Sequence, residues 1–318
     1  MALNKPIRIG TRDSQLAMWQ ATTVQSQLEA LGHQTELVPV KSQGDLNLSE
    51  PLYEMGITGI FTKTLDVAQV KGDIDIAVHS LKDVPTQLPK GMLQGAVLER
   101  ASQKDILVYK NGFNPDEIMT IATGSLRRKS QWLNMNSHHQ VVDLRGNVNT
   151  RLAKLQSNKE WNAAIFAKAG LDRINLLSQL KGNYGFEYFD LDSFIPAPAQ
   201  GAMMITVMER DPDMVDAIAA LNHKPTQLCV DTERQFLRAL EGGCTAPIGA
   251  IATIENDELH FTGCLLSLDG SQRIDVSNRT AVSSIEVDEN YAFAKAQSQH
   301  ILDHNGSKLM REIKSQLN

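Results

Sequence analysis

The chain has 318 residues, of which 42% are apolar and 21% charged, and its formal net charge is −6. This length exceeds what one core usually serves, so we expect two or three folded domains rather than a disordered chain. General binding of nucleic acid is disfavoured because phosphate neutralisation needs a basic surface. The opening MALNKPIRIG lacks an apolar leader and no stretch is long enough to span a bilayer, so we expect a cytoplasmic protein that does not bind membranes.

The first third of the chain alternates strands and helices. Its apolar pattern predicts a strand at 7–10, a helix at 15–31, a strand at 37–40, a helix at 61–70 and a strand at 74–78. Ser14 suits the N-cap of the first helix, and Gly32 suits the position after its end. This order of elements implies a parallel sheet.

The remaining two thirds continue in this style. Predicted strands lie at 106–109, 121–122, 141–144, 163–167 and 203–207, with helices at 125–135 and 148–156. Prolines 196 and 198 mark a connector, after which the strand at 203–207 returns to the first domain. The last third predicts a helix from Thr226, its cap, to Leu240, then strands at 247–254, 259–267 and 272–276, and a helical end from about 291 to 317.

The three cysteines are Cys229, Cys244 and Cys264, too few and too far apart for a disulfide framework or a four-thiolate zinc site. Cys264 lies in a predicted strand and Cys229 in a predicted helix, so both are expected to pack. Cys244 lies in EGGCTAPIG, where glycines leave a thiol approachable, and both a functional and a packing role stay open. The histidines are scattered, so no metal site is predicted.

Polar and charged residues follow several predicted strands. Asp83, in HSLKDVP, is either a solvated partner of Lys82 or a carboxylate at the ligand-binding edge of the sheet. His79 is expected to be a structural hydrogen-bonding residue rather than a base. Single loop arginines are usually solvated, but a clustered set suits a small polyanion. That set is Arg12, Arg127, Arg128, Arg145, Arg151 and Arg173.

Five segments, in this order, resemble the signature segments of porphobilinogen deaminases: HSLKDVP, TGSLRRKSQ, LRGNVNTRL, IPAPAQGAM and EGGCTAPIG. The opening IRIGTRDSQLAMWQA also resembles the first strand, turn and helix of that family. The similarity runs from about Ile7 to the C-terminus and weakens after about Ala252. An ordered match of five segments is highly specific, whereas any one of them alone is weak.

The resemblance implies an α/β fold of three domains. Two would resemble the lobes of periplasmic binding proteins, with domain 1 at 1–100 and 200–219 and domain 2 at 101–199; domain 3, at 220–318, would be a small α/β unit. The implied enzyme is a transferase, hydroxymethylbilane synthase, which joins four porphobilinogen molecules head to tail with loss of ammonia and releases hydroxymethylbilane in haem biosynthesis. A monomer with this small-molecule substrate as its partner is expected.

The resemblance also implies roles for individual residues. Cys244 would carry a dipyrromethane cofactor through a thioether, and Asp83 would be the catalytic carboxylate that assists loss of ammonia and stabilises the resulting cation. The implied cofactor-binding residues are Lys82, Thr123, Ser125, Arg127, Arg128, Arg145 and Gln200. The implied substrate-binding residues are Arg12, Ser14, Arg145, Arg151 and Arg173.

The chain departs from the family pattern at a few positions. The usual glycine–lysine–glycine loop reads Gly56-Ile57-Thr58-Gly59, so a loop cation is missing. Gly124 replaces a serine, and Pro198-Ala199 replaces valine–glycine, which predicts a stiffer connector. Asn149 replaces a common glycine. Two other hypotheses therefore stay open: a family member with reduced turnover, and a two-lobed non-catalytic binding protein for a small polyanion, which would leave the Cys244 motif unexplained.

Overall fold

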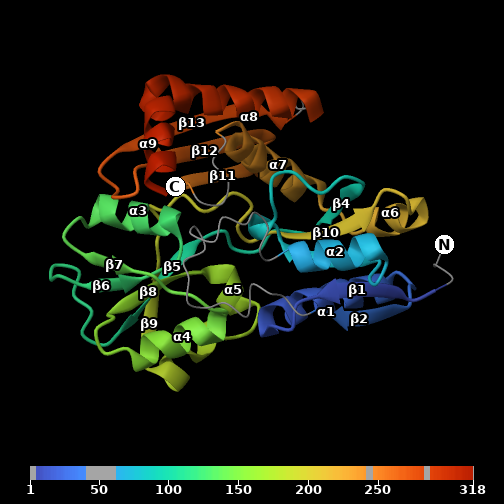
Figure 1. The fold of residues 1–318 in the computed structure, drawn as a ribbon, viewed down its shortest axis with the longest axis horizontal. Helices are drawn as coiled ribbons and strands as arrows, with labels where there is room; N and C mark the ends of the chain where they lie inside the picture. The colour runs from blue at the N-terminus through green and yellow to red at the C-terminus, as the bar shows by residue number, and fades with distance from the viewer. Residues whose placement is uncertain (1–4, 41–61, 241–245, 283–286, 318) are drawn as a thin grey trace. The chain divides into compact units, whose positions relative to one another are not determined.

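The computed structural model describes residues 5–40, 62–240, 246–282 and 287–317 (Figure 1). The described chain divides into two compact units. The first unit comprises 5–40, 62–101 and 201–227, and the second comprises 102–200 and the described residues from 228 onward. The second unit contains both a five-stranded lobe and a smaller C-terminal sheet, so the predicted boundaries between three domains stay a prediction.

The first unit is built on a five-stranded sheet, in the order β2-β1-β3-β10-β4 within the described residues. Its strands are β1 (Ile7–Thr11), β2 (Thr35–Pro39), β3 (Ile76–Ser80), β4 (Met92–Val97) and β10 (Met203–Met208). Its helices are α1 (Gln15–Ala30), α2 (Lys63–Lys71), α6 (Pro212–Ala219) and the short 3₁₀ helix η2 (Leu81–Asp83). The first three strands are parallel, as predicted, but β10 runs antiparallel to both β3 and β4. The parallel arrangement predicted for the first strands is therefore confirmed, and the late strand returns to this sheet as expected, in the antiparallel direction.

Helix α1 forms for the reasons that the sequence suggests. The Ser14 Oγ accepts a hydrogen bond of 3.3 Å from the Ala17 N–H, which satisfies one donor of the first turn. After the helix, Gly32 has φ +88°, a left-handed conformation that favours glycine. Between these ends, Val24 and Leu28 are fully buried against the sheet.

The second unit contains a further five-stranded sheet, with the order β7-β6-β8-β5-β9 among the described strands. They are β5 (Asp105–Lys110), β6 (Thr120–Ala122), β7 (Gln140–Val142), β8 (Ala163–Ala167) and β9 (Phe186–Asp190). The helices of this lobe are α3 (Leu126–Met135), α4 (Val148–Ser157), α5 (Lys168–Asp172), η3 (Leu177–Gln179) and η4 (Leu180–Tyr184). Strand β5 is antiparallel to both of its neighbours, β8 and β9.

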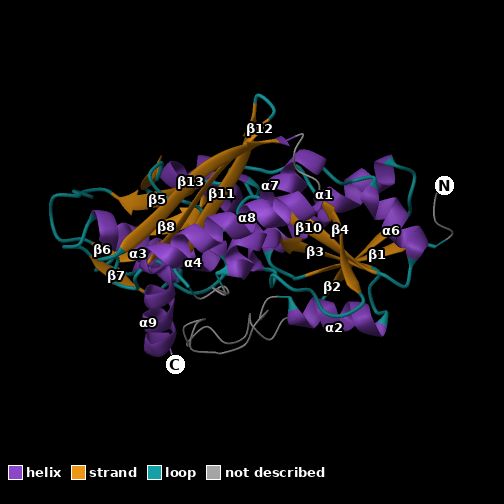
Figure 2. Ribbon diagram, turned by 90° about the horizontal axis from the view of Figure 1, so that it is seen from above, coloured by secondary structure: helices purple, strands orange, loops and turns teal. Residues whose placement is uncertain are grey.

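The C-terminal sheet is antiparallel and is covered by helices (Figure 2). Its strands are β11 (Ile248–Glu255), β12 (Glu258–Leu266) and β13 (Arg273–Ala281), and the helices are α7 (Lys224–Ala239), α8 (Val287–Ile301), η7 (Leu302–Gly306) and α9 (Ser307–Leu317). Phe261 of β12 joins the two layers, because its ring lies 5.0 Å from that of Phe236 on α7 and 6.3 Å from that of Phe293 on α8. Cys229 and Cys264 are buried in this unit, as predicted.

One prediction for the C-terminal part was wrong and another is confirmed. Helix α7 begins at Lys224, so Thr226 lies inside its first turn, and the ring Nδ1 of His223 accepts the Thr226 N–H at 3.3 Å. The predicted helical character of the C-terminal end is confirmed, and the turn at η7, where Asn305 has φ 75°, separates α8 from α9. An asparagine followed by Gly306 tolerates this left-handed turn, which no regular helix can contain.

Candidate functional site

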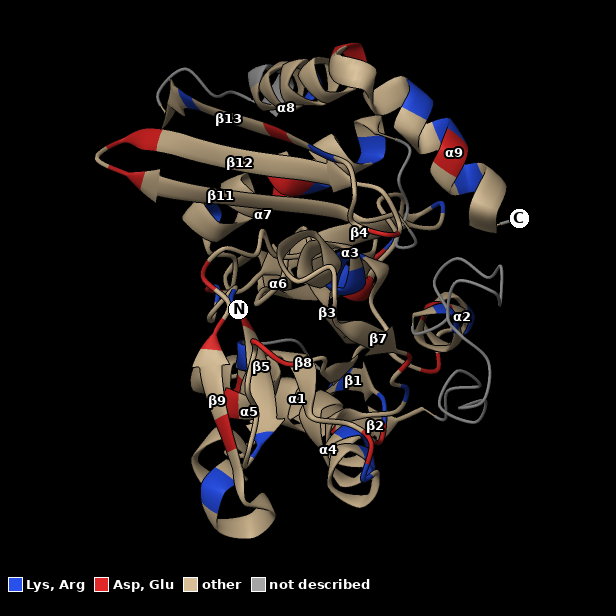
Figure 3. Ribbon diagram, turned by 90° about the vertical axis from the view of Figure 1, so that its left-hand side faces the viewer, with Lys and Arg blue, Asp and Glu red and all other residues tan. Residues whose placement is uncertain are grey.

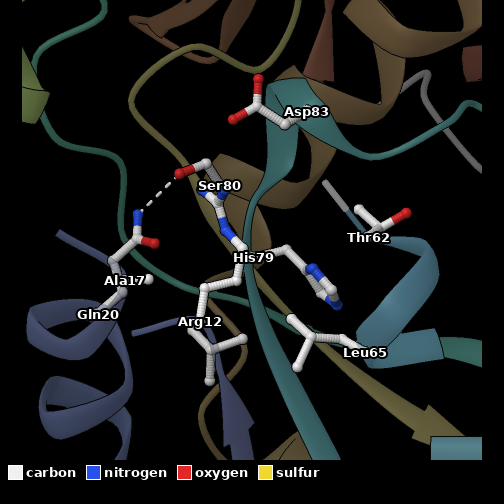
Figure 4. Close-up of a pocket in the computed structure, with 9 residues that line it drawn as sticks. Arg12, Ala17, Gln20, Thr62, Leu65, His79, Ser80 and Asp83 are labelled. Atoms are coloured by element: carbon white, nitrogen blue, oxygen red, sulfur yellow. Dashed lines mark hydrogen bonds between the residues drawn. The ribbon is translucent and has the colours of Figure 1, made fainter. Parts of the chain in front are cut away.

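A pocket opens in the first unit where parallel strands β1 and β3 end (Figure 4). Arg12 directly follows β1, His79 and Ser80 end β3, and Asp83 closes η2; all four line the pocket. Parallel neighbours present their carboxyl ends at one edge of a sheet, which is where open α/β folds bind ligands. The structure therefore brings Arg12 and Asp83, both predicted site residues, to a common pocket.

The pocket floor is polar and held in place by hydrogen bonds. The Gln20 side-chain amide donates to the Ser80 Oγ at 2.9 Å. His79 is buried, and its Nε2 lies 3.5 Å from the Thr206 hydroxyl. Burial, with a smaller contribution from the Arg12 cation, lowers the pKa of His79 to about 4. The imidazole is therefore neutral near pH 7, which agrees with a structural role rather than with that of a base.

Two other predicted residues of the first unit are half-buried and are not among the residues that line the pocket. Lys82 lies in η2, next to Asp83. Ser14 caps α1. Their functional roles therefore stay predictions.

In the second unit, a buried carboxylate holds the two adjacent arginines of α3. Asp105 is the first residue of β5 and is 1% exposed, and Arg127 and Arg128 are each 5% exposed. The Arg127 Nη1 lies 2.7 Å from one carboxylate oxygen, and the Arg128 Nε and Nη2 lie 2.9 and 2.8 Å from the other. Burial alone would raise the pKa of Asp105, but the two guanidinium groups outweigh it and hold that pKa well below its usual range.

Gln200 completes this network from the connector that follows β9. Its side-chain amide donates to an oxygen of Asp105 at 2.9 Å and to the Gln103 carbonyl at 2.8 Å. Its carbonyl oxygen lies 3.4 Å from the Arg128 Nη2. Gln200 is fully buried, so the predicted residues Arg127, Arg128 and Gln200 do meet, around an acid that was not predicted.

The loop before α3 contains two further predicted residues. The Ser125 Oγ accepts the Arg128 N–H at 3.4 Å as the N-cap of the helix. The Thr123 Oγ1 accepts the Ser125 N–H at 3.3 Å. The same hydroxyls therefore fix the start of the helix that positions both arginines (Figure 3 shows the basic residues of α3 in blue).

The other predicted arginines of this lobe differ in burial. Arg145 is buried, whereas Arg151 and Arg173 are half-buried. The Arg151 Nε donates to the Gly146 carbonyl at 2.7 Å, within the turn that leads into α4. Burial lowers the pKa of Arg173 to about 10, so this side chain keeps its positive charge near pH 7.

Sequence reasoning missed three buried polar residues that organise the second unit. Asp105 begins the apolar run DILVY, where an acid at the head of a buried strand was the available signal. Gln131 of α3 both donates to and accepts from the Ile195 backbone, at 2.9 and 2.8 Å. Glu233 of α7 accepts the backbone N–H groups of Ala199 and Ala252 at 2.6 and 2.7 Å. These last two gave no local signal, because their partners are distant in sequence.

Some predictions fall outside the described part of the chain. Cys244 and the segment Gly56–Gly59 are among the residues that the structure does not describe. In the part that it does describe, no group of three or more acidic, histidine or cysteine residues could hold a metal ion, and no helix has the length and apolar character needed to cross a membrane.

Comparison with known proteins gives a consistent result. Residues 7–216 match the family model "Porphobilinogen deaminase, dipyromethane cofactor binding domain", and residues 227–302 match "Porphobilinogen deaminase, C-terminal domain". A porphobilinogen deaminase of Synechococcus elongatus is 41% identical and covers 84% of each chain. That of Pelotomaculum thermopropionicum is 39% identical over 86% of this chain and 87% of its own. That of Moorella thermoacetica is 37% identical over 98% and 97%.

Among solved structures, the periplasmic aliphatic sulphonate binding protein SsuA of Escherichia coli aligns with a TM-score of 0.41 and 13% identity. The alignment covers 95% of this chain and 88% of that one.

Proposed function

The chain belongs to the porphobilinogen deaminase family, and on that premise we propose which of its residues carry the family's reaction. The reaction is that of a transferase, which condenses four porphobilinogen molecules with loss of ammonia and releases hydroxymethylbilane. Dipyrromethane is the cofactor, and it supplies the pyrrole on which the chain of rings grows. The proposal rests above all on one observation, the common pocket of Arg12 and Asp83 at the ends of β1 and β3.

Asp83 is the catalytic carboxylate in this proposal. It lies at the end of η2 and lines the pocket at the ends of β1 and β3. A carboxylate there can hydrogen-bond a pyrrole N–H and stabilise the positive charge that develops as ammonia leaves. Arg12 lines the same pocket and can bind an acetate or propionate of the substrate through its fork of N–H donors. His79 lines the same pocket and is neutral near pH 7, so it adds no positive charge that would compete for the carboxylate.

The second unit fits an anionic cofactor. Its two buried guanidinium groups both contact the single carboxylate of Asp105. Among the described residues, the buried Arg127 Nε has no hydrogen-bond partner. A buried donor without an acceptor is costly, and an acetate or propionate oxygen would relieve that cost. Arg127, Arg128 and Arg145 would bind these carboxylates, with Thr123, Ser125 and Gln200 as polar neighbours in the same unit. By the family pattern, Lys82 would also bind the cofactor.

The remaining assignments follow the family pattern. Cys244 would attach the cofactor by a thioether, and Ser14, Arg145, Arg151 and Arg173 would bind substrate carboxylates. We also propose that the protein acts as a monomer in the cytoplasm with porphobilinogen as its partner and without nucleic acid. Light scattering of the purified protein tests the first of these points, since a dimer would double the mass of 35.1 kDa.

The decisive experiment combines intact mass with turnover. The purified protein should exceed the mass of the bare chain by the cofactor, and Cys244→Ser should show the bare mass. Asp83→Asn should keep the cofactor but lose about 100-fold or more in kcat, because a general acid–base and electrostatic group is removed. Asp216→Asn, which changes an exposed carboxylate of α6 in the same unit, is the matched control. Normal turnover by Asp83→Asn would overturn the role of Asp83.

A further inference from the structure

The buried acid Asp105 has a position that neither the family pattern nor the pocket explains. Its carboxylate receives contacts from both adjacent arginines of α3 and from the amide of Gln200. Each oxygen serves a different arginine: one contacts Arg127 and the other contacts Arg128. Because the carboxylate is planar and rigid, this arrangement fixes the two guanidinium groups relative to each other.

Two further contacts aim each arginine. The Arg127 Nη1 also donates to the Ile195 carbonyl at 2.9 Å, and the Arg128 Nη1 donates to the Ile165 carbonyl at 3.2 Å. Each guanidinium is thus held between one backbone carbonyl and Asp105. The Arg127 Nε is left without an acceptor among the described residues.

The charges in this group also follow from Asp105. Two adjacent buried cations repel each other and resist desolvation, so a second anion is needed for both to remain in the interior. One carboxylate between them removes most of that repulsion. An uncharged residue at position 105 would leave the two guanidinium groups without the anion that lies between them.

We propose that Asp105 is a positioning residue, which fixes Arg127 and Arg128 so that they can receive carboxylates of the pyrrole rings. This inference rests on the proposed function. It assigns the acid no contact with cofactor or substrate, because its oxygens are occupied by the arginines and Gln200. The acid stays ionised throughout the pH range in which the enzyme would be assayed, since the guanidinium groups keep its pKa far below that range.

The test compares two variants of Asp105 with a matched control. Asp105→Asn keeps the shape and removes the charge, and Asp105→Glu keeps the charge but displaces it by one methylene. The control is Asp190→Asn in the neighbouring strand β9, because Asp190 also pairs with two cations, Lys104 at 3.0 Å and Lys168 at 2.9 Å. For each variant we would measure the melting temperature, the cofactor-bearing fraction by intact mass, and kcat and KM per cofactor-bearing molecule.

We expect kcat to fall by about 100-fold in Asp105→Asn, as misplacement by about 1 Å can cause, with KM little changed. Its cofactor-bearing fraction should also fall. Asp105→Glu should lie between this variant and the wild type in both measurements, and Asp190→Asn should match the wild type. A structural role alone would lower the melting temperature and leave kcat per cofactor-bearing molecule unchanged.

Three results would overturn the inference: wild-type kcat in either folded Asp105 variant, an equal loss in Asp190→Asn, or failure of both Asp105 variants to fold, which would make the role purely structural. A failure of the proposed function is distinct, because the wild type itself would then carry no cofactor and form no hydroxymethylbilane.

Discussion

The carboxylate of Glu233 accepts a hydrogen bond of 2.6 Å from the backbone N–H of Ala199, a residue with φ 62°. A residue with a side chain is disfavoured in this left-handed region by about 1–2 kcal/mol, whereas glycine is not. The family pattern has glycine at this position, so the alanine brings strain into the connector that precedes Gln200. The bond to Glu233 helps to hold the strained conformation.

Replacing Ala199 with glycine should relieve this strain. The gain is partly offset because glycine makes the unfolded chain more flexible, so we expect Ala199→Gly to raise the free energy of unfolding by up to about 1 kcal/mol. Chemical denaturation measures this change. Ala197→Gly, two residues earlier and without a positive φ, is the control and should destabilise. If Ala199→Gly and Ala197→Gly lowered the free energy of unfolding equally, Ala199 would not be strained.

Glu233 should be sensitive to loss of one oxygen acceptor. Its two oxygens accept the N–H groups of Ala199 and Ala252, and its side chain is fully buried. Glu233→Gln places an NH₂ group against one of these N–H donors, so we expect a loss of about 1–3 kcal/mol in the free energy of unfolding. Glu258→Gln, at a half-buried position of β12 that pairs with the exposed Arg279, should change it little. A wild-type denaturation midpoint for Glu233→Gln would show that these bonds contribute little.

Restoring the family's serine at Gly124 should harm the protein rather than improve it. A Cβ added at Gly124 would lie 2.7 Å from the Leu144 carbonyl oxygen, which is closer than real contacts allow. We therefore expect Gly124→Ser to cost about 1–3 kcal/mol in the free energy of unfolding through backbone displacement. Gly182→Ser, where an added Cβ meets nothing within 4 Å, is the control. A gain in stability or in kcat for Gly124→Ser would show that the loop can move aside.

His79 should make the folded state sensitive to mild acid. Its folded pKa of about 4 lies below the ordinary value of 6.5, so the unfolded chain binds the proton more readily. The contribution of neutral His79 to the free energy of unfolding is complete above pH 6.5 and is lost as the pH falls from 6.5 to about 4. The whole loss is on the order of 3 kcal/mol. When the free energy of unfolding is measured by chemical denaturation at several pH values in this interval, its dependence on pH should be weaker for His79→Gln than for the wild type. An unchanged slope would assign the acid sensitivity to other groups.

Helices and strands could be predicted from the sequence where neighbouring residues alone determine them. Helix α1 has a capping serine, an apolar face and a terminal glycine in the expected places. Strand β4 (MLQGAV) was missed because Gln94 and Gly95 interrupt its apolar pattern, and its pairing with β10 is a long-range relationship. The break in the terminal helix depends on the single asparagine before Gly306.

The site was predicted in part for the same reason. Arg12 and Asp83 follow parallel strands, so their common edge could be inferred from the order of elements. The arginines of α3 were identified as anion binders. The acid at the head of the buried run DILVY could have been noticed, but its pairing with Arg127, 22 residues away in the chain, could not. Buried ion pairs depend on tertiary register, which a single sequence does not display.

The place of β10 in the first sheet has a consequence for synthesis on the ribosome. Strand β4 pairs only with β10 among the described strands, and β10 begins at Met203, more than a hundred residues after β4 ends at Val97. A nascent chain that has emerged only to the end of β9 therefore has both β3 and β4 without their shared neighbour. Exposed strand edges invite association between chains. The nascent chain should thus depend on chaperones until the second lobe and the strand β10 that follows it have been translated.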